Sequence, residues 1–326
     1  MSEVRHERSS SGNARRVNWP FVRSTIVPLL LPIWFVIYAI QTFVHFSIHD
    51  AIGVDLAIYR HAAEVALGGG NPWIPDPGWV SFAAPPPTLL LYLPVTLMPL
   101  PLATVVMMSA GVLGAAWAIR RLHLPLWWLL FPPLFDALIV GNPDALVLPL
   151  LLVRGPLAGL AAVLKVYALV PLLLQRRWAA VVLAGAVGAL SLPQLPNFLA
   201  AIEVIRRALE TTAKLSAWGT LFVVPVIIAL WLLRRRGAEY LVVPTLWPNT
   251  QSHYGTMALP AIHPYPLAAA LIGLNTPLVP PIAVMVMAVE DWVRTRHPTA
   301  AGASDIAQSS PPMAEDAPAG LPEGSR

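Results

Sequence analysis

Long hydrophobic stretches separated by polar turns run along most of this chain. The first stretch covers 25–44, and further stretches follow almost to Asp291. A stretch of about 20 apolar residues is long enough to cross the hydrocarbon core of a bilayer. Because the stretches follow one another so closely, residues 24–289 are predicted to form one transmembrane domain. The polar segments on either side, 1–23 and 290–326, bury too little apolar surface to fold and are predicted to be disordered cytoplasmic tails.

Composition supports the same class of protein. Hydrophobic residues make up 56% of the 326 residues and charged residues only 12%, whereas about a quarter of the residues in a soluble domain are charged. We therefore expect an all-α fold, a polytopic bundle of roughly eight to ten membrane helices with short interfacial helices in its first outer loop. The chain also holds 35 prolines, and those inside apolar stretches should break or kink the helices.

Arginine clusters orient this bundle. The formal net charge is +4, but most arginines lie beside apolar stretches, which is the positive-inside pattern rather than a nucleic-acid surface. Arginines within 1–23 place the N-terminus in the cytoplasm, so the polar stretch 45–87 lies on the extracytoplasmic face. Within it, Asp55–Leu67 is predicted to be a short helix, because its apolar residues recur at helical spacing before a run of glycines.

Two later arginine pairs mark returns to the cytoplasm, Arg120-Arg121 and Arg176-Arg177. Since 156–174 is expected to be one crossing, 124–153 must contribute an odd number of crossings. The same counting places the loop that contains His253 outside, on the face of Asp55. The chain should therefore be a multi-pass protein of the cell membrane with an extracytoplasmic site.

Asp55 is the best candidate for chemistry in the first outer loop. It stands where a polar loop meets the short helix, beside Tyr59 and Arg60, and a carboxylate there can take a proton from an acceptor hydroxyl. The alternative is that Asp55 only caps this helix. Asp50 is a competing acid, and an exposed loop carboxylate is the simpler interpretation of it.

Other charged residues lie inside apolar stretches, where acids and bases are costly and often functional. Asp136 and Asp144 flank the break at Gly141-Asn142-Pro143, and Lys165 lies in the middle of a predicted crossing. A buried ammonium at Lys165 needs a partner, which could be either acid or the phosphate of a lipid substrate. His253 lies in a polar loop and could hold a phosphate or a sugar hydroxyl. The chain has no cysteine, no common soluble-enzyme motif and no cluster that demands a metal or cofactor.

Three segments in order resemble glycosyltransferase family 87, a family of polytopic mannosyltransferases of the GT-C type. The first segment is Asp55-Leu-Ala-Ile-Tyr59-Arg60, followed by the turn Gly69-Gly-Asn-Pro-Trp73. The second is Gly141-Asn-Pro-Asp144, followed by Leu164-Lys-Val-Tyr167, with Asn142 in place of the usual Gln. The third is Leu246-Trp-Pro-Asn-Thr-Gln-Ser-His253-Tyr254, which lacks the family's tryptophan before the histidine.

The resemblance implies a GT-C fold and an inverting transfer of a sugar, mannose in the family, from a polyprenyl-phosphate donor. It implies that Asp55 is the general base that activates the acceptor hydroxyl of a lipid or glycan. By the same comparison Lys165 and His253 would lie near the donor phosphate and sugar, and substrate contacts would come from a set of side chains: Tyr59, Arg60, Asn142, Asp144 and Tyr254. The expected partners are the donor, the acceptor and membrane lipid, with no nucleic acid, metal or cofactor.

Two other functions remain open at this stage. A transporter or lipid flippase could use Lys165 and the proline-broken helices as a substrate path, although the chain shows no paired half-chain repeats. A degenerate family member could retain the fold and act as a scaffold, which the departures at Asn142 and before His253 allow.

Overall fold

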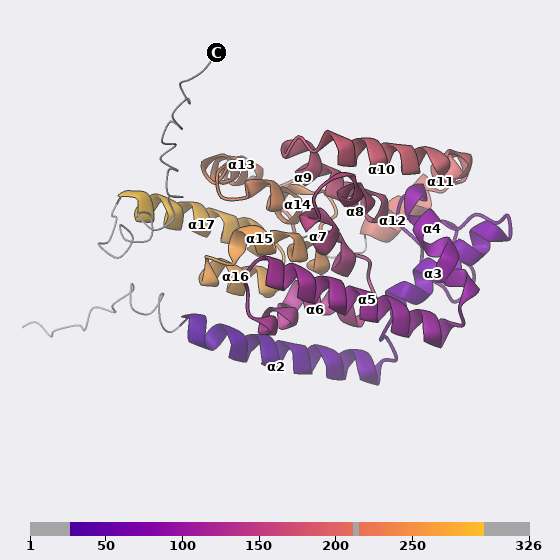
Figure 1. Cartoon of the computed structure of the whole chain (residues 1–326), viewed down its shortest axis with the longest axis horizontal. Coiled ribbons are helices and arrows are strands. Elements are labelled where there is room, and N and C mark those ends of the chain that lie inside the picture. The colour runs from indigo at the N-terminus through magenta and orange to yellow at the C-terminus, as the bar shows by residue number, and fades with distance from the viewer. Residues whose placement is uncertain (1–26, 211–214, 297–326) are drawn as a thin grey trace, which may run out of the picture.

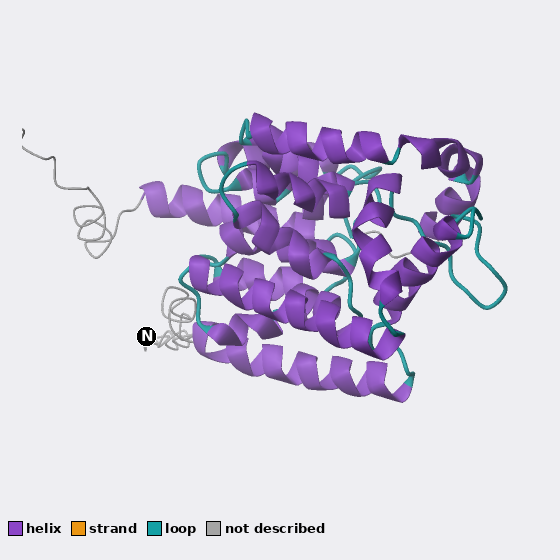
Figure 2. Ribbon diagram, turned by 45° about the vertical axis from the view of Figure 1, so that its right-hand side comes forward, coloured by secondary structure: helices purple, strands orange, loops and turns teal. Residues whose placement is uncertain are grey.

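The computed structural model describes residues 27–210 and 215–296, and these residues form helices, turns and loops without a strand (Figures 1 and 2). The predicted all-α class is therefore confirmed for this part of the chain. The expected tail 1–23 lies outside the described residues. The boundary of the second tail is wrong, because 290–296 belong to helix α17 (Val279–Arg296), where Arg294 pairs with Glu290 at 2.6 Å.

Two helices are long and apolar enough to cross a membrane, α2 (Val27–Ile48) and α5 (Leu100–Arg121). Two further crossings are possible if each of two bent helix pairs is counted as one span. Many large apolar side chains on α2 and α5 are exposed, as expected of surfaces that face lipid rather than water. Helix length and hydropathy thus give two to four candidate spans among the described residues, fewer than the eight to ten predicted.

The shortfall has a local cause, because several predicted crossings are broken into short helices. The stretch 156–174 forms η4 (Pro156–Ala158), α8 (Gly159–Leu164), η5 (Val166–Ala168) and α9 (Leu169–Leu174), and its backbone is extended at Lys165 with φ −145° and ψ 112°. The apolar stretch 256–274 is likewise divided among η8 (Ser252–Ala258), α15 (Leu259–Ile262) and α16 (Pro266–Gly273), with prolines at or just after the breaks. A proline lacks the backbone N–H of a helix interior and restricts the residue before it, so helices end there.

The first break produces a helical hairpin. Helices α6 (Pro132–Ile139) and α7 (Asp144–Leu152) are bent by 119° relative to each other. Helix α7 packs beside α5 and runs in the same direction, since Gly111 lies near Ala145 and Gly114 near Pro149. It therefore returns toward Arg120 and Arg121, the end from which this segment came. This return favours an even number of crossings in 124–153 over the odd number expected from sequence.

A second hairpin follows directly. The side chain of Arg177 donates to the carbonyl oxygens of Leu151 and Val153 and reaches that of Gly155 at 3.5 Å. The start and the end of the segment 156–174 therefore meet at Arg177, and helices α8 (Gly159–Leu164) and α9 (Leu169–Leu174) are its two arms. Lys165 lies at the apex between them.

A third hairpin carries the histidine loop. It consists of α14 (Val242–Leu246), the turn at 247–251, η8 (Ser252–Ala258) and α15 (Leu259–Ile262). Its ends meet, because a Cβ placed on Gly237 would lie 3.5 Å from that of Ala261. His253 is therefore near the apex.

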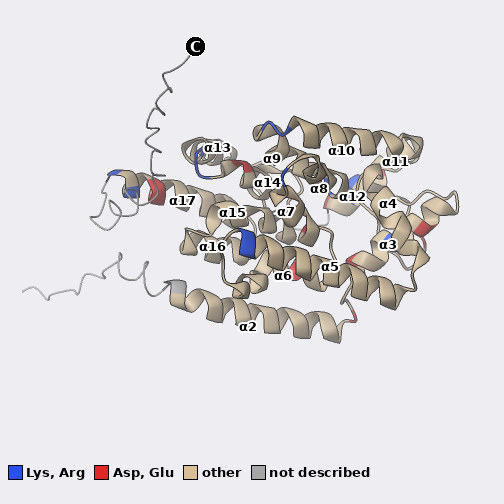
Figure 3. Cartoon of the chain, viewed as in Figure 1, with Lys and Arg blue, Asp and Glu red and all other residues tan. Residues whose placement is uncertain are grey.

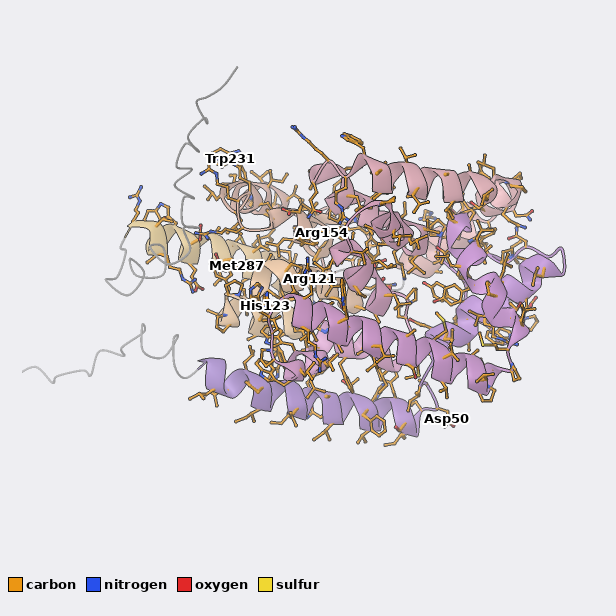
Figure 4. The ribbon with its side chains drawn as sticks, in the orientation of Figure 1. Asp50, Arg121, His123, Arg154, Trp231 and Met287 are labelled. Atoms are coloured by element: carbon orange, nitrogen blue, oxygen red, sulfur yellow. The ribbon has the colours of Figure 1, made fainter. Side chains whose placement is uncertain are left out.

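Basic residues mark the end of the molecule where all three hairpins begin and end. We call this the arginine end, defined by Arg120-Arg121, Arg176-Arg177, Arg234–Arg236 and Arg294. It lies on the half that holds α13 (Val223–Leu232), α17 and the start of α10 (Trp178–Leu190) (Figure 3). Asp50 lies at the opposite end, and Arg121, His123 and Arg154 lie away from it (Figure 4). One orientation of the molecule thus satisfies the positive-inside pattern.

The opposite end is covered by the short helices that sequence placed in the outer loops. Helix α3 (Val54–Leu67) matches the predicted Asp55–Leu67, and the short helices α4 (Pro86–Tyr92) and η2 (Leu93–Leu97) follow it. The remaining elements are η3 (Leu126–Leu130), η4 (Pro156–Ala158), η5 (Val166–Ala168), α10 (Trp178–Leu190), η6 (Leu192–Gln194), α11 (Leu195–Ala200), α12 (Ile202–Glu210), α13 (Val223–Leu232), η7 (Ala238–Tyr240) and α16 (Pro266–Gly273).

Candidate functional site

A polar cluster lies where the three hairpin apices meet helix α3. Asn142, Asp144 and Lys165 are buried there, with exposed fractions of 5%, 2% and 8%. A buried charge is costly unless it is paired and hydrogen-bonded. The side chains around these three residues are therefore the place to look for chemistry.

Helix α3 reaches this cluster because its first turn docks on the end of α6. The backbone N–H groups of Gly53 and Asp55 donate to the carbonyls of Ile139 and Val140, both at 2.9 Å. Unpaired N–H groups at the start of one helix thus satisfy unpaired carbonyls at the end of another. Gly53 precedes the helix in a left-handed conformation and no side chain caps it, so the capping interpretation of Asp55 is wrong.

Gly141 lets the two helices approach this closely. Its φ is +69°, and a Cβ at this position would lie 3.0 Å from the Cβ of Leu56. A larger residue would therefore suffer both backbone strain and a collision with α3. The glycine places the following residue, Asn142, directly under the first turn of α3.

Asn142 joins three of the predicted site residues. Its Nδ2 donates to Oδ2 of Asp55 at 2.6 Å and lies 3.3 Å from Nε2 of His253, while its Oδ1 accepts from the backbone N–H of Asp144 at 2.9 Å. Asp55 itself is only partly buried. Its carboxylate is thus held in place by one short hydrogen bond and still accessible to a substrate.

Asp144 is the charged centre of the cluster. Its Oδ1 accepts a hydrogen bond from the hydroxyl of Tyr167 and lies 3.7 Å from Nζ of Lys165. Its Oδ2 lies 3.3 Å from Nε2 of His253 but has no hydrogen bond of regular geometry. This buried oxygen therefore keeps acceptor capacity for a donor that approaches the cluster.

Aromatic rings enclose the ammonium group. Nζ of Lys165 lies 5.4 Å from the centroid of the Tyr59 ring, a cation–π distance. Tyr254 belongs to the same wall, with its ring 4.2 Å from that of Tyr167. Tyr59 and Tyr254 therefore lie beside the cluster. The ring of Tyr59 contacts Lys165, and the ring of Tyr254 contacts Tyr167.

The other candidate residues lie apart. Arg60 turns away from the cluster, with its guanidinium donating to the carbonyl of Met98 at 3.1 Å and pairing with Glu64 at 2.8 Å. Asp50 is exposed in a turn after α2. Asp136 belongs to a second polar group, where both of its oxygens accept from the hydroxyl of Tyr38 and one also accepts from Asn275.

His253 is held in a neutral state. Burial lowers its pKa below the ordinary value of 6.5, and the nearby Lys165 acts in the same direction against the opposing charges of Asp144 and Asp55. In the tautomer that leaves Nε2 without a proton, the imidazole can accept from Nδ2 of Asn142, which lies 3.3 Å away. The ring is therefore suited to hydrogen bonding and to proton exchange.

Two contributors were not singled out from sequence. Tyr167 was seen only as part of the segment Leu164–Tyr167, and its contact with Asp144 depends on two hairpins meeting. Tyr92 is buried under Tyr59 with rings 4.9 Å apart, and its hydroxyl has no hydrogen-bond partner. An isolated tyrosine in an apolar stretch gives no signal that would distinguish it from ordinary core packing.

Together, these side chains offer a partly exposed carboxylate, a buried ammonium, a neutral imidazole and an unpaired acceptor oxygen. Within the described ranges, no three His, Asp or Glu side chains gather in a way that could hold a metal ion. The chain matches no protein-family model, and neither a curated protein nor a solved structure matches it.

Proposed function

We propose that the protein is a membrane glycosyltransferase that moves a sugar, mannose in the family it resembles, from a polyprenyl-phosphate donor to a lipid or glycan acceptor. The observation that carries the proposal is the convergence of Asp55, Asn142, Lys165 and His253, which come from four separate segments, on one buried cluster. The sequence segments that resemble glycosyltransferase family 87 contribute these same residues. The proposal includes a GT-C bundle in the cell membrane, with the site on the extracytoplasmic side.

Asp55 is the general base of this reaction. Its carboxylate takes the proton of the acceptor hydroxyl as the hydroxyl oxygen attacks the anomeric carbon. The bond between that carbon and the phosphate oxygen breaks, and the polyprenyl phosphate leaves with the electron pair. Attack from the face opposite the leaving group inverts the anomeric configuration. The hydrogen bond from Asn142 orients the base without occupying the other carboxylate oxygen.

The remaining charged groups serve the donor. Lys165 is the only lysine of the cluster, and its ammonium can shift from Asp144 toward the phosphate as negative charge develops on the leaving group. The unpaired Oδ2 of Asp144 and the neutral imidazole of His253 can then bind sugar hydroxyls. Sugar hydroxyls would then donate hydrogen bonds to the carboxylate of Asp144 while the ammonium of Lys165 faces the phosphate.

Apolar side chains beside the cluster suit a lipid donor. A small pocket of about 10 Å³ between α5 and the α6–α7 hairpin is lined by Tyr92, Met107, Met108 and Asn142, among others. Methionine side chains adapt to irregular apolar partners. A polyprenyl chain lying along α5 would bring its phosphate to the cluster from this side.

The test is the donor requirement of the wild-type protein. Membranes that contain it should transfer radiolabelled mannose from polyprenyl-phosphate mannose to lipid or glycan, and should not use a nucleotide sugar directly. Membranes from the same host without the protein give the background. If no polyprenyl-phosphate sugar yields product above that background, the proposed function is wrong.

A second candidate, a transporter, has one observation in its favour. The Asp144–Lys165 pair is formed at two breaks between helices, and broken helices that place charged groups in the interior are typical of transporter substrate sites. Proteoliposomes distinguish the two functions. A transporter would take up a solute without forming a glycosidic bond, whereas the enzyme would form product without net uptake.

A further inference from the structure

A second polar cavity lies at the arginine end, away from the cluster of Asp55. Its volume is about 220 Å³, and it is lined by Arg236, Pro260, Ala261, Pro264, Tyr265, Asp291 and Arg294. The residues come from the turn after α13, from α15 and the loop that follows it, and from α17. The proposed glycosyl transfer uses none of them.

The two arginines are fixed in position and remain accessible. Nε of Arg236 lies 3.0 Å from Oδ1 of Asp291, which also accepts from the hydroxyl of Tyr265 at 3.1 Å. Arg294 donates to Glu290 at 2.6 Å, and its guanidinium lies 5.1 Å from the centroid of the Tyr265 ring. The side chains of Arg236 and Arg294 are nevertheless 54% and 50% exposed.

Each guanidinium can therefore bind a further acceptor. Arg236 uses Nε for Asp291, which leaves the donors of its terminal amino groups, and a guanidinium has more donors than one carboxylate accepts. The acids fix the orientation of both arginines, so little conformational entropy would be lost on binding. Arg234 and Arg235 in the same turn add positive charge to this surface.

We propose that this cavity binds the phosphate group of an anionic phospholipid. Guanidinium groups recognise phosphate with paired, charge-assisted hydrogen bonds. A cavity of this size holds a headgroup rather than a whole lipid. The acyl chains would then lie outside it, along the apolar surface of neighbouring helices.

The surroundings favour a lipid over a soluble phosphate compound. Val289 and Trp292 on α17 are 63% and 50% exposed, and Trp231 on α13 is 61% exposed. Arginines lie over both indole rings, Arg234 over Trp231 at 4.4 Å and Arg296 over Trp292 at 4.3 Å. Tryptophan and arginine side by side are typical of the membrane–water interface, where basic pockets between helices bind anionic headgroups.

The experiment measures how lipid stabilises the purified full-length protein in detergent. The midpoint of thermal unfolding is followed against the concentration of phosphatidylglycerol, phosphatidylcholine or inorganic phosphate. The variant is Arg236→Gln with Arg294→Gln. The control is Arg120→Gln with Arg121→Gln, which removes the same charge at the same end of the molecule but outside the cavity.

Phosphatidylglycerol should raise the midpoint of the wild type and the control at similar concentrations. The cavity variant should need at least about tenfold more of this lipid, because it loses charge-assisted hydrogen bonds to phosphate. Equal responses of variant and control would overturn the site, and equal protection by inorganic phosphate or phosphatidylcholine would overturn the assignment to an anionic lipid.

A second measurement does not depend on the folding of any variant. Native mass spectrometry of the wild type, purified from membranes that contain both lipids, should show phosphatidylglycerol retained at least about tenfold over phosphatidylcholine relative to the bulk mixture. Retention in the bulk ratio would contradict the proposal. Because no residue of the cavity belongs to the cluster of Asp55, this result and the sugar-transfer result are independent.

Discussion

Asp144 and Lys165 depend on each other for their burial. With exposed fractions of 2% and 8%, neither charge has water as an alternative partner. We predict that Lys165→Met lowers the free energy of unfolding by about 3–5 kcal/mol, because it leaves the carboxylate of Asp144 unpaired. The double variant Lys165→Met with Asp144→Asn should recover part of this loss. Denaturant unfolding in mixed micelles measures both, and a single variant as stable as the wild type would show that the pair is not required.

His253 makes stability depend on pH. Its pKa in the folded protein is lowered by burial, with a further decrease from Lys165. Below the ordinary value of 6.5 the unfolded chain therefore binds a proton that the folded protein excludes, so stability falls as pH falls. We predict that the thermal midpoint drops less between about pH 7 and pH 5 in His253→Gln than in the wild type. Parallel pH curves for the two proteins would contradict this.

At the same scale, sequence identified most of the polar cluster. Charged residues in apolar stretches must find partners, so sequence offered Asp136, Asp144 or a lipid phosphate for Lys165, and the structure pairs it with Asp144. Arg60 was placed in the site only because it follows Tyr59. Successive residues on a helix point in directions about 100° apart, and Arg60 reaches Met98 and Glu64 instead.

At the scale of elements, the contact between α3 and α6 decides where Asp55 lies. We predict that Gly141→Ala lowers sugar transfer, because its methyl group pushes Leu56 and the first turn of α3 away from Asn142. Gly78→Ala is the matched control, since its φ is +86° but nothing lies within 4 Å of the added Cβ. Both variants carry a backbone cost of about 1–2 kcal/mol. Equal transfer rates in the two variants would rule out a role for this contact.

Sequence located the break at 141–143, but neither the break at Lys165 nor the direction of the chain after each break. The glycine and proline within 141–143 mark a break, and the positive-inside pattern fixes the ends of crossings. Counting crossings assumes that each apolar stretch continues to the other side. The hairpins α6–α7 and α8–α9 return instead, which depends on tertiary packing of α7 on α5 and on the contacts of Arg177.

At the scale of the whole molecule, the hairpins predict which residues share a side of the membrane. The chain has no cysteine, so a thiol reagent would label only a single introduced cysteine, and the labelling shows on which side of the membrane that residue lies. Arg154→Cys should react with a membrane-impermeant thiol reagent from the same side as Arg121→Cys, and Asp50→Cys from the opposite side (Figure 4). Labelling of Arg154→Cys together with Asp50→Cys would restore the odd number of crossings expected from sequence.

The central claim is that the cluster around Asp55 transfers a sugar, and one comparison tests it most directly. Transfer of radiolabelled mannose from polyprenyl-phosphate mannose is measured for the wild type, Asp55→Asn and Asp50→Asn at equal amounts of folded protein. Loss of the general base should reduce the rate of Asp55→Asn by about 10²–10⁴-fold, although the new amide oxygen can still accept from Asn142. Asp50→Asn should retain the wild-type rate, because Asp50 is exposed and apart from the cluster. A wild-type rate in Asp55→Asn would contradict the account.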